Sequence, residues 1–191
     1  MCNLLKKVKD TSTATSFPES LDSASAMIKK QEAAIKQLDD QRANIMSMMH
    51  KGKELAKDGN APPFIKAEVA NLDAAWNDAY SNTTEKLKTL KNTQKVWTQY
   101  QEQKDEILEL IKQAELELSK MSGGTSPKNI AAELQAKQDI GIALREATED
   151  MLRKLRDICA ALCKVTAPEK KPALQKEVNP LKKIFLDDFK C

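Results

Sequence analysis

Residues 86–100 read KLKTLKNTQKVWTQY and contain neither glycine nor proline. The stretch lies between two similar segments, where a chain of two linked globules would be expected to have a loop. The absence of helix breakers extends on both sides, because the 59 residues between Pro63 and Gly123 contain no glycine or proline. We therefore predict one helix through the boundary between two domains, roughly 90 Å long at about 1.5 Å per residue.

Apolar residues at helical spacing predict three further helices. The first covers 21–57 and ends at a cluster of one glycine and two prolines. Another runs from Pro127 to about Val165, and the last begins at Pro172. Pro180 lies inside this last tract, where it should kink the helix or delay its start because it has no backbone N–H. The predicted fold class is all-α.

The sequence also repeats itself. The matching positions at an offset of 107 are Ile35, Ile45, Met48 and Leu55 with Ile142, Leu152, Leu155 and Leu162, and those at an offset of 109 are Val69, Leu72 and Trp76 with Val178, Leu181 and Phe185. The change of offset falls in the loop between helices, where insertions are tolerated. Together with Trp97, Ile107 and Ile111, these residues form the predicted structural core.

A period near 107 with Leu72 and Trp76 late in one unit and Trp97 early in the next resembles the spectrin repeat family. The resemblance covers nearly the whole chain. It implies tandem three-helix antiparallel coiled coils, in which the last helix of one unit continues as the first helix of the next. The first repeat would occupy 1–90, with the end of a first helix followed by a second and a third. The other repeat would occupy 91–191, with its third helix truncated.

Both predicted repeats are incomplete, which leaves two interpretations open. The chain is either a fragment of a longer rod or a chain whose partial units pair with a second copy. Exposed apolar stripes on an incomplete bundle would favour self-association in either case.

Composition and charge limit the classes of partner. The 31 basic and 28 acidic residues are interspersed and give a net charge of +3. This balance gives little reason to expect nucleic acid or an anionic membrane as the main partner. No apolar run approaches the roughly 20 residues needed to cross a bilayer, so we expect no membrane insertion in this segment. The four cysteines are too few for a disulfide framework, which favours reduced thiols and a cytoplasmic location.

The sequence offers no constellation for catalysis, for a cofactor or for a metal. His50 is the only histidine, so a histidine-based catalytic pair or metal cluster would lack partners. Cys159 and Cys163 share a helix face, yet no further metal ligands lie near them in the sequence, and we expect them to be small core residues. We predict that the protein is not an enzyme and uses no cofactor.

Four lysines are the candidate partner-binding residues: Lys86, Lys88, Lys91 and Lys95. An acidic partner, actin or lipid head groups could use this basic patch. The alternative interpretation is a solvated side of the helix, which is the usual meaning of a charge run.

The resemblance to spectrin repeats implies a structural spacer, linker and docking rod within a large cytoskeletal protein. The Lys-, Gln- and Glu-rich helices look most like the rods of giant nesprin or spectraplakin linkers. A nesprin-like protein would join actin to the cytoplasmic face of the nuclear envelope. The partners implied are cytoskeletal or scaffold proteins, and further copies through incomplete repeats. The alternatives are a stand-alone helical-bundle adaptor and a membrane-surface-binding bundle.

Overall fold

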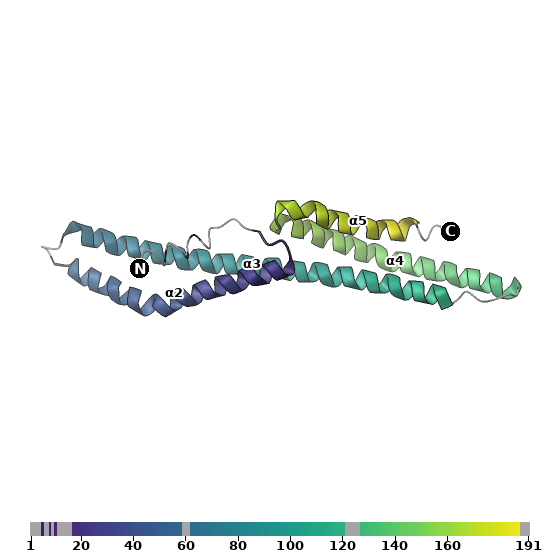
Figure 1. The fold of residues 1–191 in the computed structure, drawn as a ribbon, viewed down its shortest axis with the longest axis horizontal. Helices are drawn as coiled ribbons and strands as arrows, with labels where there is room; N and C mark the ends of the chain where they lie inside the picture. Colours follow the sequence, from purple (N-terminus) through teal and green to yellow (C-terminus); the bar gives the residue numbers. More distant parts are fainter. Residues whose placement is uncertain are drawn as a thin grey trace. The chain divides into compact units, whose positions relative to one another are not determined.

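The computed structural model describes residues 5, 8, 10, 17–58, 62–120 and 127–187, of which 118, 127–129 and 180–187 are described by their backbone alone. The elements are α2 (Leu21–Leu55), α3 (Pro63–Lys120), α4 (Pro127–Val165), the 3-10 helix η1 (Pro168–Lys170) and α5 (Lys171–Asp187) (Figure 1). The described part of the chain contains no strand. The predicted all-α fold is therefore confirmed.

Local sequence determines where these helices begin and end. Ser20 and Ser23 form a capping box, in which each hydroxyl accepts a hydrogen bond from the other residue's backbone N–H. Helices α3 and α4 each begin with a proline, whose missing N–H has no intrahelical role at that position. Helix α5 starts at Lys171 and continues past Pro180, so the predicted delay in its start is wrong. The 3-10 turn at Pro168–Lys170 leads directly into the helix.

Helix α3 runs without interruption for 58 residues, so the predicted continuous helix is confirmed. Its central stretch buries two threonines, Thr83 and Thr93, in place of apolar residues. Each hydroxyl donates to the carbonyl four residues earlier, at 2.5 Å for Thr83 and 3.0 Å for Thr93. Since these polar atoms have partners, burial at this point does not carry the cost of an unsatisfied group.

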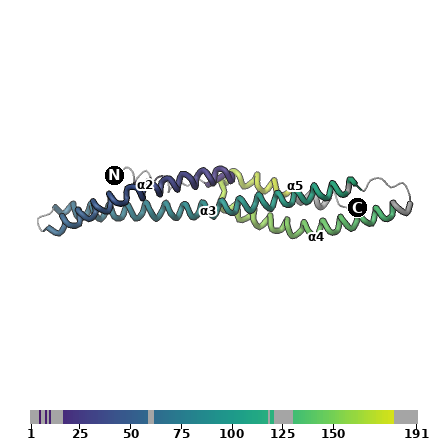
Figure 2. Tube along the Cα trace, turned by 90° about the horizontal axis from the view of Figure 1, so that it is seen from below, coloured from purple at the N-terminus to yellow at the C-terminus, as the bar shows by residue number. Residues whose placement is uncertain are grey.

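The chain divides into two compact units, 1–94 and 95–191. Helix α3 contributes its first part to one unit and its last part to the other. Within the first unit α2 lies alongside α3, and within the second unit α4 and α5 lie alongside the end of α3 (Figure 2).

The core of the first unit draws side chains from three segments. Its buried members are Leu5, Val8, Ala34, Leu38, Ile45, Met49, Trp76 and Ala79, with Leu72 and Tyr80 partly buried against them. Leu5 and Val8 are helical, and their exposed fractions are 4% and 3%. Burial of this kind contributes about 25 cal/mol for each Å² of apolar surface removed from water, so the N-terminal segment adds to the stability of this unit.

The core of the second unit combines α3, α4 and α5. Its larger buried side chains are Trp97, Tyr100, Ile107, Leu144, Leu152, Leu155, Cys159, Leu162, Leu174 and Val178. A polar contact also joins α3 to α5: the Tyr100 hydroxyl donates to Glu177 Oε2 at 3.3 Å, and Lys104 Nζ donates to the same oxygen at 2.7 Å. Burial and the charge of Glu177 raise the pKa of Tyr100, so this donor keeps its proton.

Three residues of the predicted core lie at the surface. The exposed fractions of Met48, Leu55 and Ile142 are 41%, 59% and 55%. Met49 occupies the buried position beside Ile45 because it lies four residues on, whereas Met48 is turned about 100° from it. Leu55 is the last residue of α2, and Ile142 lies about 200° around α4 from buried Leu144.

The other predicted core positions divide into three groups. Ile45, Trp76, Trp97, Ile107, Leu152, Leu155, Leu162 and Val178 are buried, and Ile35, Val69, Leu72 and Ile111 are half-buried. The side chains of Leu181 and Phe185 lie outside the described part of the structure.

Gly52 and Gly141 form a matched pair for testing the packing of α2 against α3. A Cβ added at Gly52 would overlap Val69 Cγ2, whereas a Cβ at Gly141 would meet nothing within 4 Å. We expect Gly141→Ala to raise the free energy of unfolding by about 0.5–1 kcal/mol through helix propensity. Gly52→Ala should instead lower it by about 1–3 kcal/mol through overpacking, because the β-branched Val69 has little rotamer freedom. Urea unfolding followed by circular dichroism measures both changes.

The double variant Gly52→Ala/Val69→Ala provides the control. Removing the Val69 methyl groups should restore most of the stability lost in Gly52→Ala. Equal stabilisation by Gly52→Ala and Gly141→Ala would show that α2 and α3 do not approach closely at this point.

Candidate docking site

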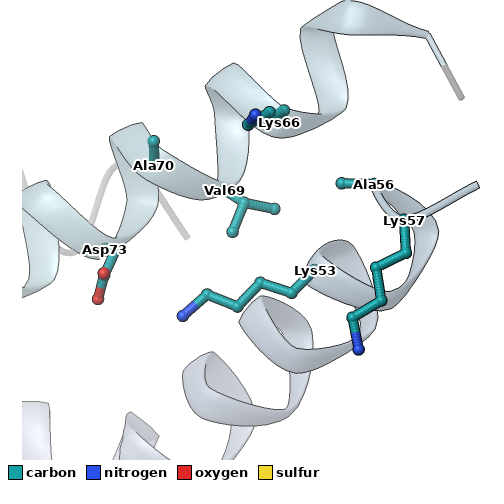
Figure 3. A pocket seen from close by; sticks show the side chains of 7 residues that line it. All are labelled: Lys53, Ala56, Lys57, Lys66, Val69, Ala70 and Asp73. Atoms are coloured by element: carbon teal, nitrogen blue, oxygen red, sulfur yellow. The ribbon is translucent and has the colours of Figure 1, made fainter.

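Two cavities lie between α2 and α3 of the first unit, and both are lined by these two helices. The smaller, of about 390 Å³, is lined by Lys53, Ala56, Lys57, Lys66, Val69, Ala70 and Asp73 (Figure 3). The larger, of about 810 Å³, is lined by Arg42, Met46, Trp76, Asn77, Tyr80, Ser81, Thr84, Glu85 and Lys88.

The spacing of the lining residues places both cavities on one face of the helix pair. On α2 the lining positions 42, 46 and 53 are separated by four and seven residues, and Ala56 and Lys57 line the smaller cavity just beyond the end of this helix. On α3 the lining positions 66, 70, 73, 77, 81, 84 and 88 follow one another in steps of four or three residues, and positions 69, 76, 80 and 85 also line the cavities. Both patterns keep to one side of a helix. We call the face that holds both cavities the α2–α3 groove.

The floor of the α2–α3 groove is apolar and partly aromatic. The Trp76 ring stacks on Tyr80, with ring centroids 6.1 Å apart and an interplanar angle of 26°. Met46 lines the same cavity with 41% of its surface exposed, so a flexible side chain is available for contact. At the other end, Val69 projects from α3 toward α2 (Figure 3).

The rim of the α2–α3 groove is mainly cationic. Its exposed basic side chains are Arg42, Lys53, Lys57, Lys66 and Lys88. Lys57 pairs with Glu54 at 2.7 Å, but the other four have no ion pair within 4.0 Å in the described part of the chain. The two acidic lining residues are Asp73 and Glu85, and Asp73 also accepts a hydrogen bond from the Asn77 side chain at 3.4 Å.

Of the four lysines predicted to bind a partner, Lys86 lies apart from the other three. Lys86 is half-buried and lies about 200° around α3 from Lys88, on the other side of the helix. Lys91 forms an ion pair with Glu32 of α2 at 2.9 Å, and Lys95 belongs to the second unit. Lys88 alone among the four borders the α2–α3 groove.

The amino-acid sequence alone does not mark Arg42, Lys53 and Lys66 as members of one surface. Each is one charge among many on an amphipathic helix, and they share a rim only because α2 packs against α3. Their signal in the sequence is a helical spacing relative to Met46 and Ala70, which becomes informative only once the pairing of the two helices is known.

The two cysteines of α4 are free thiols, of which Cys159 is buried in the core of the second unit and Cys163 is half-buried. Burial, together with neighbouring Cys163, raises the pKa of Cys159 to about 11. The thiol therefore stays protonated and unreactive at neutral pH. Among the described residues, no group of three or more His, Cys, Asp or Glu side chains could hold a metal ion. None of the helices in the described ranges is apolar over a length that could span a membrane.

These features define an all-α protein of long, paired helices with candidate contact surfaces along its helix faces. Over 185 residues, the chain is 42% identical to muscle-specific protein 300 kDa of Drosophila melanogaster. The match covers 96% of this chain but about 2% of the length of that relative. The chain is thus similar to a short segment of a far longer muscle-specific protein. No protein-family model matches the chain, and no solved structure does.

Proposed function

We propose that this chain is a structural spacer and protein-docking rod within a large cytoskeletal protein. The observation that carries the proposal is helix α3, which belongs to both compact units without a break. At about 1.5 Å per residue, its 58 residues span roughly 87 Å. Similarity to a short segment of a very long relative supports a role as one part of an extended chain.

The two units are tandem spectrin-like repeats, with a first repeat at 1–90 and a second at 91–191. Support comes from the division of the chain at 94/95, close to that boundary, and from the packing within each unit. Three segments contribute to the first core, and α3, α4 and α5 contribute to the second.

The parent protein connects the actin cytoskeleton to another structure, such as the cytoplasmic face of the nuclear envelope. This part of the proposal rests on the resemblance to nesprin-type and spectraplakin rods and on the similarity to a giant muscle-specific protein. Its partners are cytoskeletal or scaffold proteins and further copies of the chain.

The mechanism of such a spacer is mechanical. Each unit has its own hydrophobic core, so a load can unfold one unit while the other keeps its internal contacts. A helix common to both units carries the load along its backbone hydrogen bonds. The chain then lengthens in steps rather than failing at once.

Optical tweezers on the complete chain, held at its two ends, test this proposal. We expect two unfolding steps, each releasing on the order of 300 Å, because each unit holds about half of the 191 residues and an extended residue spans about 3.5 Å. Extension without a resolved step would contradict a load-bearing role. Sedimentation with phosphatidylserine vesicles provides the contrast: strong, salt-sensitive binding would favour the membrane-surface alternative.

A further inference from the structure

We infer that the α2–α3 groove binds an amphipathic helix that carries carboxylates along the edges of its apolar face. The inference deepens the docking part of the proposed function and does not depend on the load-bearing part. It rests on three properties of the groove: its shape, its apolar floor and its cations that have no ion pair in the described part of the chain.

The shape of the α2–α3 groove fits a third helix. The lining residues run from Arg42 to Lys57, 15 residues further on, and from Lys66 to Lys88, 22 residues further on. These distances correspond to about 22 Å and about 33 Å, the length of a helix of roughly 15–22 residues. Steps of four and three residues, as on α3, are also the spacing at which a partner helix packs knobs into holes.

The floor offers anchoring points for apolar side chains of the partner. Half-buried Tyr80 on α3 and exposed Met46 on α2 line the larger cavity, and Trp76, with 4% of its surface exposed, stacks on Tyr80. Aromatic residues at the centre of an interface contribute strongly to binding, and methionine adapts to the shape of its partner. Leucine or isoleucine side chains at heptad spacing would fill the two cavities in turn.

The rim determines the charge of the partner. Arg42, Lys53, Lys66 and Lys88 have no ion pair within the described part of the chain, and they border the groove from both helices. Asp73 and Glu85 offset only part of this charge. Carboxylates on either side of the partner's apolar stripe would meet these cations, which favours an acidic helix over a basic one.

A synthetic helical peptide of about 20 residues, with leucine at a and d and glutamate at e and g, is the probe for this inference. Fluorescence anisotropy measures its affinity for the complete chain. We expect saturable one-to-one binding that weakens about tenfold or more between about 0.05 M and about 0.3 M salt. The same peptide with glutamine in place of glutamate should bind at least about tenfold more weakly.

Charge-reversal variants at the rim test whether the peptide binds in the α2–α3 groove. The double variant Arg42→Glu/Lys88→Glu should weaken binding about tenfold or more, because both residues border the larger cavity. The matched control is Lys29→Glu/Lys36→Glu, which reverses two exposed α2 lysines that line neither cavity. The control should change the affinity by less than about twofold. Circular dichroism checks that both variants keep the fold.

Several results would overturn the inference. Absence of saturable binding at low salt would do so, as would equal affinity for the glutamate and glutamine peptides or equal loss in the two double variants. If sedimentation showed that the parent chain is a dimer and that Arg42→Glu/Lys88→Glu is a monomer, the occupant of the groove would be a second copy of the chain. If the parent chain bound vesicles and the same double variant did not, the occupant of the groove would be a lipid surface. None of these outcomes affects the two unfolding steps that we expect when the chain is stretched with optical tweezers.

Discussion

Replacement of Trp76 with alanine is expected to lower the free energy of unfolding of the first unit by about 3–5 kcal/mol. Trp76 has 4% of its surface exposed and packs in the cluster that also holds Leu38, Ile45 and Met49. Its loss removes the contacts of a large ring, including the stacking on Tyr80, and leaves a cavity that the neighbouring helix can only partly fill. We expect the loss of helical circular dichroism to begin at a lower urea concentration.

The fluorescence of Trp97 shows whether the destabilisation is confined to the first unit. It becomes the remaining tryptophan in Trp76→Ala, and it is buried in the core of the second unit. Its fluorescence should change at a higher urea concentration than the first loss of circular dichroism. The control is Phe64→Ala, in the same helix, where 64% of the side chain is exposed and the change should stay within about 0.5 kcal/mol. Equal effects of the two substitutions would refute the assigned core.

Replacement of Asn92 with proline is the second change with a large expected effect. Asn92 is exposed in the middle of α3, so its side chain supports no core contact. A proline there removes one backbone hydrogen bond and clashes with the carbonyl four residues earlier, at a cost of about 3 kcal/mol or more. Because α3 belongs to both units, we expect destabilisation seen by the fluorescence of Trp76 and of Trp97, each measured with the other tryptophan replaced by phenylalanine.

Asn92→Ala separates the backbone effect from the loss of the side chain. Alanine has a higher helix propensity than asparagine, so this variant should be as stable as the parent or more stable by a few tenths of a kcal/mol. If Asn92→Pro unfolded at the same urea concentration as Asn92→Ala, the helix would already be interrupted at this position, and the basis for a spacer function would be lost.

The amino-acid sequence by itself determined the helices of this protein. Helix breakers and apolar spacing act over a few residues, so the start of α3 at Pro63, the span of α4 from Pro127 to Val165 and the continuity through KLKTLKNTQKVWTQY follow from local rules. The same rules identified Trp76 and Ile107 as members of an apolar seam, and both are buried.

Only the tertiary structure decided which side of each helix is covered. Met48 and Met49 are adjacent residues of the same type, yet Met49 is buried beside Ile45 and Met48 lies at the surface. Likewise, Arg42 and Lys88 are 46 positions apart and border one cavity because α2 packs against α3. Helical periodicity places residues on a face, but the neighbouring helix determines which face loses contact with water and which charges meet across a groove.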